Sequence, residues 1–177
     1  MEQVYTLKKI LDILNISPPK PTVYREEKKG LIPTAKRIKR GSTEVRVWTE
    51  DQIPEFGKKY GNIKNENGKT KFISINANKG GTLKTTISFN LARFLALNGL
   101  KVLCCGLEVS QKSLTRSLEN MREIENISQI DDFEDLTLYD VAENKKSILE
   151  VIKKTTLPNL DYIPEGLSLS KLDNYLK

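Results

Sequence analysis

Two lysines and three threonines fall within nine residues, at 78–86, in the sequence NKGGTLKTT. Lysine ammonium groups bind phosphate oxygens, and a threonine hydroxyl is a common ligand of the Mg²⁺ that accompanies a nucleoside triphosphate. The adjacent Gly80 and Gly81 let the backbone approach an anion closely and adopt positive φ. In this pattern Lys84 reaches the β- and γ-phosphates, and Thr85 coordinates Mg²⁺. The residues therefore predict a site for a nucleoside triphosphate.

The flanking residues predict the elements that hold such a loop. The apolar run at 72–76 predicts a strand before it, and the run at 87–97 predicts a helix after it. A helix N-terminus presents unpaired N–H groups and a positive dipole end, which together bind anions. The competing interpretation is an ordinary Gly-Gly turn between a strand and a helix, with the lysines present by chance.

The loop departs from the usual phosphate-loop pattern G-x-x-x-x-G-K-[ST], because Asn78 and Leu83 stand in place of the two glycines. It fits the variant x-K-G-G-x-x-K-[ST], and on this motif the chain resembles the ParA/MinD group of ATPases. Most members of that group carry glycine where Leu83 stands. The resemblance implies ATP and Mg²⁺ as cofactors, with Thr85 as the metal ligand, and a homodimer in which Lys79 reaches the partner's nucleotide. The cofactor-binding residues it implies are Lys79, Gly80, Gly81, Thr82, Leu83, Lys84, Thr85 and Thr86.

A second buried strand is predicted at 101–105, parallel to the one at 72–76 across a right-handed βαβ unit. ParA relatives carry D-x-D-P-Q at the next positions. Here Glu108 matches the second acid of that motif, and Gly106 replaces the first. The resemblance thus makes Lys79, Lys84 and Glu108 the candidate catalytic residues. An ordinary surface acid at a strand end is the alternative interpretation of Glu108.

Further along, a helix is predicted from residue 138 and a third strand at 157–164. A hydrophobic strand ending in Asp-x-Pro, the Walker B region of the resembling ATPases, is absent from the 177 residues. The expectation is therefore the front portion of a ParA-type domain: an α/β fold with a partial P-loop NTPase-type parallel sheet and flanking helices. Whether the chain is an enzyme stays open at this point.

Basic charge is concentrated in the first part of the chain. Residues 1–68 contain 14 Lys/Arg and nine Asp/Glu, a net charge of +5, whereas the other residues contribute +1 to the total of +6. An excess of this kind in one region favours an anionic polymer as partner.

The same region contains short predicted elements. Thr6 is expected to cap a helix over 7–14, and Thr22 to cap a second helix that ends before Gly30. A strand is predicted at 44–48, and Thr49 is expected to cap a last helix to residue 60.

This order of elements and the amino-acid sequence around Gly30, Arg37 and Trp48 resemble the MerR-type winged-helix domain. In that family the second helix enters the major groove and the wing contacts the DNA backbone. A solvated basic hairpin is the alternative. The DNA-binding residues that the resemblance implies are Thr22, Tyr24, Arg25, Lys28, Lys36, Arg37, Lys39, Arg40 and Arg46.

The predicted organisation is a MerR-like winged helix at 1–60, a linker at 61–70 and the first part of a ParA-type ATPase domain at 71–177. The combination resembles the longer ParA proteins of plasmid and chromosome partition, which implies DNA, a homodimer and a ParB-type centromere-binding protein as partners. With no apolar run near the roughly 20 residues of a membrane span, the expected location is cytoplasmic and nucleoid-associated. The sequence has no histidine, which excludes a hydrolase built on that residue. The alternative is a DNA-binding transcriptional regulator with a truncated, non-hydrolysing ATPase remnant.

Overall fold

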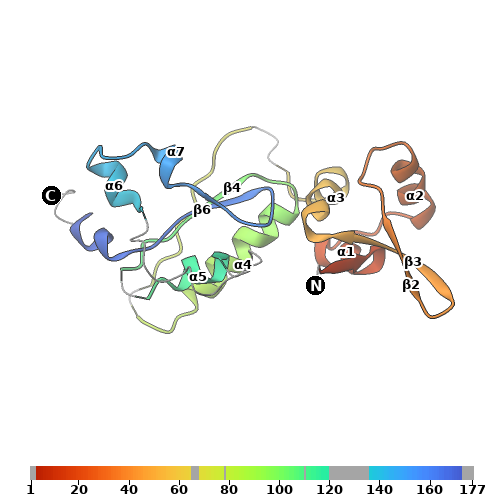
Figure 1. The fold of residues 1–177 in the computed structure, drawn as a ribbon, viewed down its shortest axis with the longest axis horizontal. Coiled ribbons are helices and arrows are strands. Elements are labelled where there is room, and N and C mark those ends of the chain that lie inside the picture. Colours follow the sequence, from red (N-terminus) through yellow and green to blue (C-terminus); the bar gives the residue numbers. More distant parts are fainter. Residues whose placement is uncertain (1–2, 65–67, 78, 110, 120–135, 173–177) are drawn as a thin grey trace. The chain divides into compact units, whose positions relative to one another are not determined.

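The computed structural model describes residues 3–64, 68–77, 79–109, 111–119 and 136–172 (Figure 1). The chain forms mixed α/β structure that divides into two compact units. The first unit comprises Met1–Lys71 and Phe94–Lys101, and the second comprises Phe72–Arg93 and Val102–Lys177.

The first unit is a three-stranded antiparallel sheet with short helices, in the strand order β1-β3-β2. The β2–β3 hairpin turns at Gly41-Ser42, where Arg40 pairs with Thr43 and Gly41 takes a φ of 62°. Figure 1 shows this hairpin extending away from the helices of its unit. The elements are β1 (Val4–Thr6), α1 (Leu7–Leu14), α2 (Lys20–Lys28), β2 (Lys36–Arg40), β3 (Thr43–Thr49), η1 (Glu50–Gln52) and α3 (Ile53–Tyr60).

Two of the three predicted helix caps are confirmed. The Thr6 hydroxyl accepts the Lys9 N–H at the start of α1, and Thr49 forms a capping box with Gln52 before α3. The predicted start of the second helix at Thr22 is wrong, because α2 begins at Lys20. A proline lies in its first turn, where no N–H is needed and the fixed φ already suits a helix, so the prolines start this helix instead of delaying it.

The core of the first unit is built around Trp48, which is fully buried. Its ring meets that of Phe56 edge-on at 5.4 Å between centroids, and its indole N–H donates to the Pro33 carbonyl at 2.8 Å. Gly57 on α3 is also buried, and a Cβ there would lie 2.3 Å from the Leu97 carbonyl oxygen of the same unit. This glycine therefore permits a close backbone contact that no larger residue allows.

The second unit contains a three-stranded sheet in the order β4-β6-β5. Strands β4 and β6 are parallel, with Cys104 opposite Tyr162, and β5 pairs antiparallel with β6. The elements are α4 (Lys84–Leu97, whose last residues belong to the first unit), β4 (Val102–Cys105), α5 (Ser113–Glu119), α6 (Leu138–Ala142), α7 (Ile148–Val151), β5 (Lys153–Lys154), β6 (Leu160–Ile163) and η3 (Leu167–Lys171).

The strand predicted at 72–76 is wrong. These residues form no regular element, and the side chains of Phe72 and Ile73 are 95% and 63% exposed. The parallel partner of β4 is β6, 55 or more residues further along, and not the segment before the loop. A strand requires a neighbour that supplies hydrogen bonds to its N–H and C=O groups, and within the described residues none is placed beside 72–76.

Candidate functional site

The phosphate loop, residues 79–86, ends in the first turn of α4. Gly81 and Leu83 both adopt left-handed conformations, with φ of 71° and 58°. The Leu83 carbonyl accepts a helical hydrogen bond from the Ile87 N–H at 2.8 Å. The chain therefore turns sharply into the helix at Leu83, so the N–H groups of the first turn, which a helix cannot pair internally, come directly after the loop.

Lys84 folds back over the loop. Its ammonium group donates to the Lys79 carbonyl at 3.1 Å and to the Ala77 carbonyl at 3.5 Å. The Thr82 hydroxyl donates to the same Lys79 carbonyl at 3.1 Å. The loop is thus closed by its own side chains around one backbone oxygen, with a positive charge on its concave side.

The two glycines of the loop face open space. A Cβ at Gly80 or Gly81 would meet nothing within 4 Å, so an anion can approach the backbone there. Leu83 does not obstruct the loop, because its side chain is 65% exposed. The donor set of ammonium groups, hydroxyls and helix-terminal N–H groups is the chemistry that binds phosphate.

The conformation at Leu83 explains why glycine suits this position. A left-handed backbone destabilises a residue that carries a Cβ by about 1–2 kcal/mol. Glycine avoids this strain, and leucine accepts it here without gaining a buried side chain.

The remaining predicted loop residues are accessible to a ligand. Lys79 and Thr86 are exposed, and Thr85, the predicted Mg²⁺ ligand, is half-buried at the second position of α4. The described residues hold no group of three or more His, Cys, Asp or Glu side chains suited to a metal ion. A metal at this site would therefore depend on the Thr85 hydroxyl and on oxygens of the nucleotide.

The start of α5, which follows Glu108 in the sequence, is held by a residue that sequence reasoning missed. Glu165, which follows β6, is buried, and its carboxylate accepts the N–H groups of Leu114 and Thr115 at 2.9 and 3.1 Å. Its own N–H donates to the Thr115 hydroxyl at 2.7 Å. The partners are about 50 residues apart, so no local pattern predicts the contact. Glu108, the predicted catalytic acid, is exposed in the segment between β4 and α5.

The neighbouring cysteines carry perturbed thiols. Burial raises the pKa of Cys104 to about 11, with smaller contributions from Cys105 and from the negative charge of Glu165. Both cysteines are free; Cys104 is half-buried and Cys105 is exposed. Protonated thiols are weak nucleophiles and weak metal ligands, so neither cysteine suits chemistry at neutral pH.

In the first unit, two predicted DNA-binding residues are engaged inside the protein. The Arg46 guanidinium lies 4.1 Å from the centroid of the Tyr24 ring and forms an ion pair with Glu27 at 3.1 Å. Glu27, which sequence reasoning also missed, accepts the Ala35 N–H at 3.0 Å through its other oxygen. This cluster joins α2, the start of β2 and β3, and it gives Arg46 a structural role in addition to any contact with DNA.

The other basic residues lie on the surface. The side chains of the four predicted cations of β2 are exposed, and Arg37 forms an ion pair with Glu44 across the hairpin at 3.3 Å. Thr22 is half-buried on α2, whereas Arg25 and Lys28 are exposed. The exposed residues are Arg25, Lys28, Lys36, Arg37, Lys39 and Arg40.

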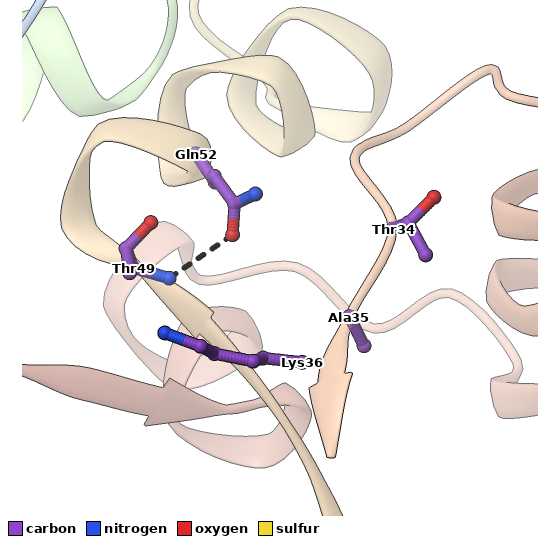
Figure 2. Close-up of a pocket in the computed structure, with 5 residues that line it drawn as sticks. All are labelled: Thr34, Ala35, Lys36, Thr49 and Gln52. Atoms are coloured by element: carbon purple, nitrogen blue, oxygen red, sulfur yellow. Dashed lines mark hydrogen bonds between the residues drawn. The ribbon is translucent and has the colours of Figure 1, made fainter.

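A pocket of about 390 Å³ lies at the base of this hairpin, lined by Thr34, Ala35, Lys36, Thr49 and Gln52. Figure 2 shows the Lys36 side chain extending toward the Thr49 end of β3, where the Thr49 N–H donates to the Gln52 side chain at 3.1 Å. The lining offers a cation and hydroxyl groups but no carboxylate, so its chemistry suits an anion better than a metal.

Residues 70–177 match the family described as an AAA domain. This range is more than half of the chain and contains the whole phosphate loop. The protein belongs to this family.

Several known proteins are similar in sequence to this chain, and some of them over more of it than the family match covers. The cell division protein PomZ of Myxococcus xanthus is 31% identical over 169 residues, which are 96% of this chain and 44% of PomZ. Protein SopA of Escherichia coli K12 is 32% identical over 157 residues, 85% of this chain and 38% of SopA. The sporulation initiation inhibitor protein Soj of Bacillus subtilis is 34% identical over 100 residues, 56% of this chain and 36% of Soj.

These similarities support the resemblance to the ParA group of partition ATPases. The chain spans less than half of the length of each of these relatives. No solved structure matches it. Within the part of the chain that the structure describes, no helix is long and apolar enough to cross a membrane.

Proposed function

We propose that the chain is an ATP-binding, ParA-like protein of plasmid or chromosome partition. The phosphate loop binds ATP with Mg²⁺, the first unit binds DNA as a winged helix, and ATP-dependent dimerisation with Lys79 reaching the partner switches DNA binding. A ParB-type centromere-binding protein is the expected protein partner.

The observation that carries the proposal is the closed loop at the start of α4. Lys84 and Thr82 converge on the Lys79 carbonyl, while Gly80 and Gly81 leave the other side of the backbone open. An accidental Gly-Gly turn has no reason to place an ammonium group over its own concave side. The arrangement matches the chemistry of a triphosphate, whose oxygens take the place of the internal carbonyl as partners of that ammonium.

The test is a titration of a fluorescent ATP analogue with Mg²⁺ into the wild type and Lys84→Ala. Hydrogen bonds to a charged group contribute about 1.5–3 kcal/mol, which predicts about 10- to 150-fold weaker binding for the variant. Lys101→Ala, which removes an exposed lysine before β4, is the matched control and is expected to bind as the wild type does. Equal affinity of Lys84→Ala and Lys101→Ala contradicts the nucleotide site.

The DNA-binding part of the proposal is supported by the exposed cations of the β2–β3 hairpin and of α2. Each phosphate contact adds about 0.9 to the slope of log affinity against log salt. Arg40→Ala is therefore expected to weaken binding and to lower that slope by roughly this amount in gel-shift titrations, whereas Lys8→Ala, on α1, is expected to change neither. A slope unchanged in Arg40→Ala contradicts a wing contact.

A second candidate is a DNA-binding regulator in which the second unit is a structural remnant. The segment at 72–76, which is predicted as a strand but forms no regular element and exposes Phe72 and Ile73, is the observation that favours it. Gel shifts with and without ATP separate the two candidates, because only the partition protein changes its DNA affinity on addition of ATP.

A further inference from the structure

Glu165 lies between the end of β4 and the start of α5, the two elements on either side of Glu108. Near β4, the Gly106 N–H donates at 3.3 Å to the carbonyl of Ile163, the last residue of β6 and two residues before Glu165. At α5, the Glu165 carboxylate accepts two N–H groups in the first turn of the helix. Gly106 and the first turn of α5, which lie on either side of Glu108 in the sequence, are therefore both held by the chain around one buried carboxylate.

The space over Gly106 is filled by this carboxylate. A Cβ at position 106 would lie 2.2 Å from Cγ of Glu165, 2.8 Å from its Cδ and 3.1 Å from its Oε1. Position 106 is also where the ParA motif has its first acid and this chain has glycine. A carboxylate is thus present at this place in the fold, but it comes from the residues after β6 instead of from those after β4.

We propose that Glu165 is a positioning residue that holds Gly106 and the first turn of α5 in place on either side of Glu108, supplying from the residues after β6 the carboxylate that a side chain at position 106 would otherwise supply. The proposal rests on the proposed function in one respect: Glu108 is the acid expected near the γ-phosphate. Glu165 acts on that residue by holding the chain on either side of it, without touching the nucleotide itself.

A purely local cap would stabilise α5 more simply. A serine or threonine at the helix start accepts the same N–H groups without burying a charge, which is unfavourable in itself. A carboxylate delivered from residue 165 does something that a local cap cannot do, because the same side chain also packs against Gly106. The contact at both ends is what distinguishes a positioning role from helix capping.

The first experiment is a double-mutant cycle in thermal unfolding with Gly106→Asp, Glu165→Ala and both together. Glu165→Ala leaves two buried N–H groups without their acceptor, and Gly106→Asp places a side chain in filled space, so each lowers Tm. Combining them is expected to restore part of the loss, because the aspartate then occupies the space that the glutamate has left. If the Tm of the double variant falls by the full sum of the two single decreases, an aspartate introduced at position 106 does not replace the Glu165 carboxylate, and the inference is overturned.

The second experiment compares the affinities for ATP and ADP analogues at a temperature where all variants are folded. Glu165→Ala is expected to weaken ATP binding about fivefold more than ADP binding, and Glu165→Gln, which keeps one acceptor oxygen, is expected to recover most of the difference. The matched control is Glu150→Ala, since Glu150 caps α7 by accepting the Ser147 N–H at 2.8 Å. It is expected to lower Tm without changing the ATP:ADP ratio, and the same unchanged ratio in Glu165→Ala reduces Glu165 to a structural cap.

If the wild type binds neither nucleotide, the proposed function fails and amide hydrogen exchange decides the positioning role alone. Glu165→Ala is then expected to raise exchange at Gly106 as well as at Leu114 and Thr115, whereas Glu150→Ala leaves these amides unchanged. Protection of the Gly106 amide that survives in Glu165→Ala overturns the inference.

Discussion

The strained backbone at Leu83 gives a prediction about nucleotide affinity. Its φ of 58° destabilises a residue with a Cβ by about 1–2 kcal/mol. The side chain is 65% exposed, so its partial burial contributes roughly a third of the 1.5–3 kcal/mol of a fully buried leucine, about 0.5–1 kcal/mol. The strain therefore outweighs the packing, and residues that tolerate the left-handed region are expected to suit the loop better than leucine does.

Three substitutions separate the backbone from the side chain. Leu83→Asn relieves the strain and keeps a side chain of similar size, Leu83→Gly relieves it but adds freedom to the unbound loop, and Leu83→Ala removes bulk while keeping the Cβ. The structure shows the left-handed conformation at Leu83, and the strain lowers the population of this conformation in the unbound loop. Relieving about 1 kcal/mol of strain raises that population, so Leu83→Asn is expected to bind an ATP analogue up to about fivefold tighter than the wild type. The affinity of Leu83→Gly is expected to lie between those of Leu83→Asn and the wild type, and the affinity of Leu83→Ala is expected to equal that of the wild type.

Isothermal titration of each variant with the Mg²⁺ complex of ATP measures the order directly. An alanine variant that gains as much affinity as the asparagine variant would show that bulk, not backbone, limits the site. A wild type that binds more tightly than all three variants would show that the leucine side chain itself contacts the ligand, and would refute the strain argument.

Three further outcomes are expected from the structure. Gly57→Ala is expected to lower Tm in a circular-dichroism melting curve, because overpacking against fixed backbone costs about 1–3 kcal/mol or more. This cost exceeds the roughly 1 kcal/mol that alanine adds to helix stability. Gly80→Ala, whose Cβ meets open space, is the control and leaves the melting curve unchanged. Arg46→Ala lowers Tm by breaking its ion pair with α2, whereas Arg40→Ala leaves Tm unchanged, and the reverse result would contradict the structural role of Arg46. Iodoacetamide at pH 8 is expected to modify Cys104 about 100-fold more slowly than an ordinary thiol, because raising its pKa from 9.0 to about 11 leaves correspondingly less thiolate. The rate is measured by tandem mass spectrometry. A rate equal to that of free cysteine would exclude the shift in pKa. Since the folded state holds this proton more tightly, the stability that Cys104 contributes is present below about pH 9 and is lost as the pH rises toward 11.

Features that depend on a few consecutive residues could be predicted from the sequence. The caps at Thr6 and Thr49 are confirmed, because a cap needs only a hydroxyl and the next few N–H groups. Trp48 and Phe56 are both fully buried, which the size of the first unit explains, since a domain this small requires both rings in its core. The predicted cap of α2, Thr22, lies three residues after the observed one, Pro19, because the sequence prediction treats the prolines as an interruption, whereas a proline also fits a first helical turn.

Features that depend on distant partners could not be predicted. The apolar alternation at 72–76 is typical of a strand, but the alternation carries no information about which neighbour completes the hydrogen bonding. The roles of Glu27 and Glu165 were invisible for the same reason, because their partners lie up to 19 and 51 residues away. In the sequence both count as ordinary negative charges, and only the fold shows that each one holds backbone N–H groups in place.

The phosphate loop depends on a few consecutive residues, so its conformation does not require a strand at 72–76. Among the described residues, the side-chain hydrogen bonds that close it join residues at most seven positions apart, the longest from the Lys84 ammonium to the Ala77 carbonyl. Its shape is set by two left-handed residues and the helix that follows, and none of these requires the preceding strand to be paired. If the loop is locally determined in this way, substitutions that disturb 72–76, such as Phe72→Ser, should leave nucleotide binding nearly unchanged, whereas Gly81→Ala, which places a Cβ on a left-handed residue, should weaken it. A Phe72→Ser variant that binds nucleotide as poorly as Gly81→Ala would show instead that the segment before the loop helps to form the site.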